Sequence, residues 1–174
     1  LFWAFFHRDE ETTLFGLPPV PDSVGDYSDR TKLADELKTL GVLISRHPLS
    51  VFETAVEKLT AEGSYPPRIR SREVPEHVGE KISIPGILIT GKEVRSRTKR
   101  SMGFLSFEDP QGIFETVLFP EAYERLLPTV EGGAAFFLIG IVEEEFDTCI
   151  INVRELIPLR SGHPIQAAGG IGRY

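Results

Sequence analysis

The stretch from Ser101 to Pro120 (SMGFLSFEDPQGIFETVLFP) limits the possible folds of this chain more than any other. Two runs rich in aromatic and β-branched residues, Phe104–Phe107 and Ile113–Phe119, flank a turn marked by Pro110 and Gly112. Proline presets φ for the second position of a reverse turn, and glycine can adopt the positive φ that closes such a loop. The pattern predicts a β-hairpin. Both faces of the second run are largely apolar, so we expect it to lie centrally in a closed or well-covered sheet.

The residues after position 77 predict the remaining strands of this sheet. A period of two begins at Val78 and continues through Ile89, and two further apolar strands are expected at 134–142 and 148–156. Between those two strands, residues 143–147 (EEEFD) predict an acidic turn. Two glycines inside the first strand indicate the bulge or sharp bend that a small barrel needs in order to close.

One short helix is expected among these strands. Pro120 suits the first position of a helix, and an apolar face follows it before Pro128. The predicted order is three strands, a helix and two strands, which is the order of an OB-fold, a mainly β, five-stranded Greek-key barrel. Such barrels bind oligonucleotides or oligosaccharides on the face of their second and third strands. The framing loops here are 94–102 and 143–147.

The first part of the chain predicts two to three helices before the barrel. Apolar residues at helical spacing predict one helix within 28–45, with Gly41 placed to end it or to pack closely. They also predict a second helix, with an apolar stripe at 49–59, that stops before Gly63. We expect a local structural role for His47, because no other His, Cys or carboxylate cluster has metal-ligand spacing. The expected organisation is a helical segment with a linker (1–63), a connection (64–77), the barrel (78–160) and a flexible tail (161–174).

Charge is distributed unevenly along the chain. The net charge of −7 argues against a protein that is strongly basic throughout and binds nucleic acid for that reason. Residues 64–104 hold nine basic and four acidic side chains, so this segment carries +5 and the rest of the chain −12. A local basic patch can concentrate an anionic ligand, although a solvated charged loop has the same composition.

The predicted first loop of the barrel is the best candidate for binding single-stranded DNA. Its cations can neutralise phosphates, and phenylalanines of the following hairpin can stack on unpaired bases. Large aromatic side chains also fill small barrels, so most of these phenylalanines are expected in the core. The candidate DNA-binding residues are Lys92, Arg95, Arg97, Lys99, Arg100 and Phe104. Because the acidic turn at 143–147 would repel the same strand, we expect weak, salt-dependent binding.

The sequence offers little for catalysis, and we expect no catalytic residues, no metal and no cofactor. Glu108 and Asp109 are adjacent, but neighbours on a strand point to opposite faces, and the turn explains Asp109. The single cysteine, Cys149, lies in an apolar strand, where inert burial is expected, and it fits a reducing cytoplasm. The apolar start of the chain, residues 1–6, is too short for a membrane span or signal peptide.

Two segments resemble the bacterial DNA polymerase III alpha subunit family, the C-family replicative polymerases. The run LGVLISRHPL at 40–49 resembles an element that precedes the OB domain in that family. Residues 85–119, with the basic turn RTKR, the run LSFED and the run VLFP that ends at Pro120, resemble the OB core itself. The resemblance implies an OB-fold module that guides single-stranded template beside the other polymerase domains. A barrel that binds tRNA or another RNA is a further alternative, against which the resemblance at 40–49 argues. It also implies that the chain is a piece of a longer protein whose catalytic domains lie upstream.

A third segment matches the position of the family's internal sliding-clamp-binding peptide. In ETTLFG, Leu14 and Phe15 fit the two anchor positions, while Glu11 replaces the usual glutamine. The resemblance therefore implies Glu11, Leu14 and Phe15 as clamp-binding residues. The corresponding alternative function is a protein-interaction module that docks on the clamp or another replisome subunit.

Overall fold

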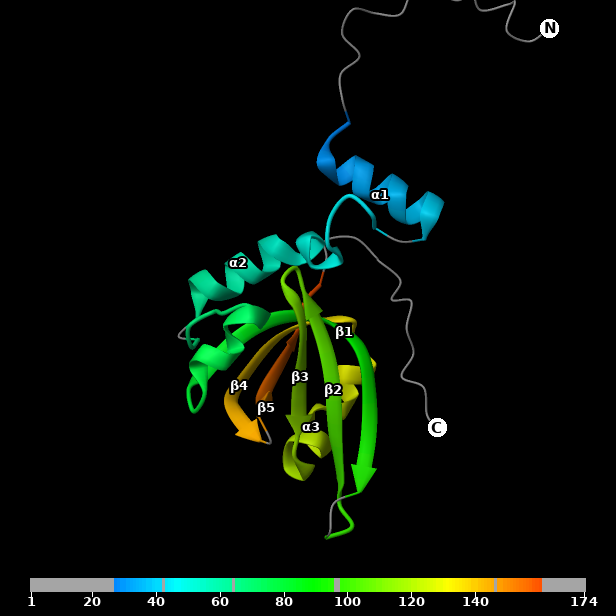
Figure 1. Ribbon diagram of the computed structural model, residues 1–174. Helices are drawn as coiled ribbons and strands as arrows, with labels where there is room; N and C mark the ends of the chain where they lie inside the picture. Colours follow the sequence, from blue (N-terminus) through cyan, green and yellow to red (C-terminus); the bar gives the residue numbers. More distant parts are fainter. Residues whose placement is uncertain (1–26, 42, 64, 96–97, 146, 161–174) are drawn as a thin grey trace, which may run out of the picture. The chain divides into compact units, whose positions relative to one another are not determined.

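The structure, a computed structural model, describes residues 27–41, 43–63, 65–95, 98–145 and 147–160 (Figure 1). The chain divides into two compact units, Leu1–Val42 and Leu43–Tyr174. The described part of the first unit contains helix α1 (Asp29–Leu40). It ends just before Gly41, where φ is +73°, which confirms the predicted role of this glycine in ending the helix.

Five strands form a closed barrel in the second unit. They are β1 (Lys81–Arg95), β2 (Ser101–Asp109), β3 (Gly112–Leu118), β4 (Ala135–Glu145) and β5 (Thr148–Pro158). The order around the barrel is β1-β2-β3-β5-β4, in which β3 and β5 run parallel and the other neighbours antiparallel. Helix α3 (Pro120–Glu131) lies between the third and fourth strands in the sequence. This is the predicted Greek-key order, and the OB-fold is confirmed.

Inward-facing aromatic rings fill the barrel. Phe107 and Phe114 are stacked with ring centroids 5.8 Å apart, and Phe136 packs edge-on against Phe107 at 6.1 Å. At Gly86 a Cβ would lie 2.8 Å from the Phe114 ring, so glycine lets β1 pass close to these rings. The pairing of β1 with β2 shifts register just after Leu88, which confirms a bulge in this strand.

Helix α3 closes one end of the barrel, as Figure 1 shows. Ala122, Leu126 and Val130 recur at every fourth position, are buried and join the barrel core. The helix continues through Pro128, whereas the sequence predicted an apolar face ending before that residue. Pro128 is exposed, and we attribute the extra turn to the burial of Val130, which offsets the missing intrahelical hydrogen bond.

A second apolar cluster covers the outside of β4. The 3₁₀ helix η2 (Pro48–Phe52) leads into α2 (Glu53–Glu62), where the sequence predicted one helix that stops before Gly63. The predicted end is confirmed. Leu49 and Val56 from these helices cluster with Phe137 and Ile139 of β4. Both faces of β4 are therefore buried along most of its length, which explains its nearly unbroken apolar run. The 3₁₀ helix η3 (Ser71–His77) was not predicted.

The acidic run 143–147 is mostly strand, which corrects the predicted turn. Glu143, Glu144 and Glu145 belong to β4 and pair with residues 150, 149 and 148 of β5. Pairing with β5 keeps the backbone of these three glutamates extended, so the chain reverses its direction only after Glu145. Asp147 there has φ +59°. Strand β1 continues through Arg95 and contains both Gly86 and Gly91, the two glycines that the sequence placed inside it.

Candidate nucleic-acid interface

One row of side chains on the outer face of the barrel combines a cation with an aromatic ring. Lys92 of β1 pairs directly with Phe104 of β2, and Phe104 pairs with Val117 of β3. Lys92 is exposed, Phe104 is 37% exposed and Val117 is buried. Directly opposed antiparallel residues have Cβ atoms about 4.5–5.5 Å apart. The structure therefore places an ammonium group beside an accessible ring, which is what a stacked base with a flanking phosphate requires.

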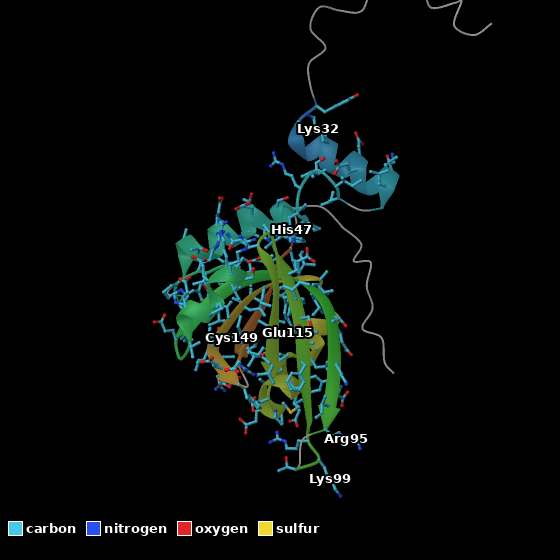
Figure 2. The ribbon with its side chains drawn as sticks, viewed as in Figure 1. Lys32, His47, Arg95, Lys99, Glu115 and Cys149 are labelled. Atoms are coloured by element: carbon cyan, nitrogen blue, oxygen red, sulfur yellow. The ribbon has the colours of Figure 1, made fainter. Side chains whose placement is uncertain are left out.

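The other described cations of the first loop lie at the tip of the β1–β2 hairpin. Figure 2 shows Arg95 and Lys99 at the end of the barrel opposite His47. Arg95 is the last residue of β1, three positions beyond Lys92, so alternation turns it to the opposite face of the ribbon. Lys99 has φ +60° in the loop itself. Lys92 and Arg95 thus do not share one face, which sequence proximity alone did not reveal.

The α3 side of this hairpin carries an ion pair. Arg100 Nη2 lies 3.2 Å from Glu124 Oε1 of α3, so this cation has a partner other than DNA. Glu93 accepts hydrogen bonds from Ser101 Oγ and, at 3.3 Å, from the Tyr123 hydroxyl. Lys92, Arg95 and Lys99 form no recorded ion pair with any residue that the structure describes. Arg97 lies outside the described residues.

The four phenylalanines of the hairpin divide equally between core and surface. Phe107 is fully buried and Phe114 is 5% exposed, whereas Phe104 is 37% and Phe119 is 42% exposed. Two of the four, and not most of them, are therefore core residues. Of the two exposed rings, Phe104 is the one paired with Lys92. Its exposure is a condition for the base-stacking role predicted for it.

Toward the β2–β3 turn the outer face becomes acidic and apolar. Ser106 Oγ donates to both carboxylate oxygens of Glu115 at 2.9 Å, next to the Lys92–Phe104 row. One row further, Glu108 receives a hydrogen bond from His47 Nε2 at 2.9 Å, and Ile113 is 64% exposed. A phosphate backbone would meet unfavourable charge there. The outer face thus favours an anionic strand only near the hairpin tip.

Asn152 of β5 is a polar residue of this region that sequence reasoning missed. It pairs with Val117 of β3 and is 3% exposed, and its Nδ2 donates to Glu143 Oε1 at 2.7 Å. This bond fixes one carboxylate of the acidic β4 end. A single Asn inside the apolar run CIINV was a signal that could have identified it.

The described residues contain no group of three or more His, Cys, Asp or Glu side chains placed to hold a metal ion. Asp109 is a turn residue, as predicted, because its Oδ1 accepts from the backbone N–H groups of Gln111 and Gly112. His47 has the expected local role, since its Nδ1 accepts from Leu49 N at 3.1 Å and caps η2. Cys149 is partly buried against the core. Within the described part of the chain, no helix is long and apolar enough to cross a membrane.

Glu11, Leu14 and Phe15 lie outside the described residues. Their assignment to clamp binding stays a prediction from the sequence. The division of the chain at 63, 77 and 160 likewise stays a prediction.

No family model matches the chain. Solved structures with partial similarity include an asparaginyl-tRNA synthetase from Pyrococcus horikoshii, with a TM-score of 0.42 and 24% identity over 56% of this chain and 24% of that one. The second OB-fold domain of replication protein A from Methanococcus maripaludis gives a TM-score of 0.39 and 14% identity over 55% of this chain and 100% of that one. These scores are too low to carry an argument, and the fold assignment rests on the strand order.

Curated proteins give a clearer relationship. The DNA polymerase III subunit alpha of Bacillus subtilis is 35% identical over 115 residues, which are 66% of this chain and 10% of that protein. An error-prone DNA polymerase of Anaeromyxobacter dehalogenans is 26% identical over 145 residues, 82% of this chain and 12% of that protein. The chain thus spans about a tenth of the length of these relatives. It is homologous to a segment of bacterial DNA polymerase III alpha subunits and error-prone DNA polymerases, the family that the motifs around the barrel indicated.

Proposed function

We propose that this chain is a replication module that engages single-stranded DNA through the outer face of its OB barrel. The observation that carries the proposal is the directly paired Lys92 and Phe104, both exposed on neighbouring strands. A base stacks on the Phe104 ring while the Lys92 ammonium group neutralises an adjacent phosphate. Arg95 and Lys99 contact phosphates where the strand passes the hairpin tip. Nucleotide addition belongs to other domains of the parent polymerase.

The proposed binding is weak and salt-dependent. Three described loop cations without a recorded ion pair are available, namely Lys92, Arg95 and Lys99. With about three phosphate contacts, the logarithm of the binding constant falls with a slope of about −2 against the logarithm of salt concentration. A fourfold increase in salt then lowers the affinity about 20-fold. Glu115 and Glu108 limit the strand to the hairpin end of the face.

Fluorescence anisotropy with labelled oligo-dT over a range of salt concentrations tests the proposal. Lys92→Gln is compared with Lys81→Gln, because both are exposed lysines of β1, and Lys81 lies at the other end of that strand, paired with β4. Lys92→Gln is expected to reduce the salt slope by about 0.7 and weaken binding, whereas Lys81→Gln leaves both unchanged. Equal effects of the two substitutions, or oligo-dT binding that survives loss of all the loop cations, would refute the proposal.

The alternative function is docking on a sliding clamp through Glu11, Leu14 and Phe15, supported by the match of this peptide to the family's clamp-binding position. Leu14→Ala with Phe15→Ala is expected to abolish capture of this chain by an immobilised clamp and leave oligo-dT binding intact. Capture that is unaffected by the double substitution removes this alternative.

A further inference from the structure

A cavity of about 150 Å³ lies at the end of the barrel remote from the basic hairpin tip. It is lined by η2 and the start of α2, by the segment 68–70, and by the β2–β3 turn. These elements belong to one compact unit, and Figure 1 shows α2 and the β2–β3 turn at this end. The volume is well below the roughly 300–1,000 Å³ of pockets for drug-sized ligands, so the cavity suits a single chemical group.

Two arginines line this cavity from the same side of an extended segment. Ile69 between them is 4% exposed and belongs to the barrel core, so alternation turns Arg68 and Arg70 together away from the core. The segment is held to β1, because Ile69 N donates to Ser83 O and Ser83 N donates to Pro67 O, each at 2.9 Å. These backbone hydrogen bonds therefore hold in place the segment that carries both guanidinium groups.

Neither arginine has a recorded ion pair among the residues that the structure describes. Asp109 also lines the cavity, but its two oxygens accept four hydrogen bonds from the Ser71 amide and hydroxyl and from the amides of Gln111 and Gly112. Three of these bonds end on Oδ1 and one on Oδ2, so the carboxylate is held by the turn and by Ser71, while its negative charge still faces the cavity.

A hydroxyl group in the cavity wall also lacks a partner. Ser50 Oγ is buried and forms no hydrogen bond with any residue that the structure describes, although Ser50 lines the cavity with Arg68 and Arg70. A buried hydroxyl without a partner is costly, and a rotation of the Ser50 side chain toward the cavity would let a ligand oxygen satisfy it. Glu53, exposed at the start of α2, is the second carboxylate in the lining after Asp109, and both oppose an anion there.

We propose that this cavity is a binding site for a phosphate group. The guanidinium groups of Arg68 and Arg70 donate to two or three of its oxygens, and the Ser50 hydroxyl donates to another. The group is either inorganic phosphate or a phosphate of a nucleic-acid strand, since both present the same oxygens to these donors. The site is independent of the Lys92–Phe104 row, and failure of one proposal leaves the other intact.

Backbone amide chemical shifts of the 174-residue chain, followed by NMR, test this site. Inorganic phosphate and oligo-dT are titrated separately, with sodium chloride at matched ionic strength as the reference. Phosphate is expected to shift the amides of Ser50 and residues 68–71. Arg68→Ala with Arg70→Ala is expected to weaken binding at least about tenfold. Glu53→Gln is expected to tighten it about two- to fivefold, because it removes one of the opposing charges.

Arg72→Ala is the matched control, because Arg72 is an exposed arginine of the same region that does not line the cavity. It is expected to leave phosphate binding unchanged. If oligo-dT shifts the same amides and the double variant removes the effect, the phosphate belongs to a nucleic-acid strand; if only inorganic phosphate does so, the site takes a small anion. The proposal is overturned if neither probe shifts these amides, or if Arg72→Ala weakens binding as much as the double variant.

Discussion

Substituting two phenylalanines of β2 should separate stability from DNA binding. Phe104 and Phe107 are three residues apart on the same strand and point to opposite sides of the barrel wall. Phe107 is fully buried, stacked on Phe114 and edge-on to Phe136. Phe104 is 37% exposed beside Lys92. Truncating each ring to Ala removes the same atoms from two different environments.

Phe107→Ala is expected to lower the free energy of unfolding by about 3–5 kcal/mol, the usual cost of removing a buried phenyl ring. That is a large part of the roughly 5–15 kcal/mol that holds a domain together, and it lowers the melting temperature by about 10–20 °C. Phe104→Ala is expected to cost about 1 kcal/mol or less, because much of its ring is already in water. Urea titration followed by circular dichroism measures both differences.

The effects of the two substitutions on DNA binding should have the opposite order to their effects on stability. Base stacking on an aromatic side chain contributes about 1–3 kcal/mol, so Phe104→Ala is expected to weaken oligo-dT binding about 5- to 150-fold. At temperatures below its melting transition, the Phe107→Ala variant should bind oligo-dT nearly as tightly as the unsubstituted protein. If Phe104→Ala destabilises the protein as much as Phe107→Ala, or leaves oligo-dT binding unchanged, the assignment of inner and outer rings is wrong.

Three further substitutions test how the barrel is held together. Asp109→Ala removes the acceptor of four hydrogen bonds, two that close the β2–β3 turn and two that tie it to Ser71 of η3, and should lower the free energy of unfolding by at least about 2 kcal/mol in urea titration. Gly140→Ala would place a Cβ 2.6 Å from the Asn152 carbonyl oxygen, so a loss of about 1–3 kcal/mol is expected in thermal melts, and an unchanged melting temperature would contradict the packing described for β4 and β5. His47→Ala should cost about 1–2 kcal/mol, because the Nδ1 that caps η2 and the Nε2 that donates to Glu108 are both lost; in a double-mutant cycle, the cost should be smaller when Glu108 is already Ala.

Short-range patterns were enough to predict the fold of this protein. Alternation and turn chemistry are local properties, so the hairpin at 101–120, the order of the five strands and the helix that begins at Pro120 could be predicted from residues a few positions apart. Element ends were less predictable. The turn at 143–147 was misplaced because ladder partners, which lie elsewhere in the sequence, decide where a strand stops.

For the candidate site, too, the sequence predicted some features and missed others. Composition identified the basic loop, and the strand order placed it beside the usual ligand face of an OB barrel. The sequence could not tell that Phe104 points outward while Phe114 points inward, or that Arg100 pairs with Glu124. It also contained no local signal for the cavity of Ser50, Arg68 and Arg70, whose walls come from three separate parts of the chain.

The sequence by itself determined the architecture, because backbone periodicity and turn preferences depend on neighbouring residues. Only the tertiary structure decided which side chains of that architecture are exposed together on one face. The exposure of a side chain, its cross-strand neighbour and its ion-pair partner depend on contacts between residues distant in sequence. These contacts form only when the strands pair around the closed barrel. The paired Lys92 and Phe104 are the clearest case, since twelve positions separate them in the chain and one register of β1 on β2 brings them side by side.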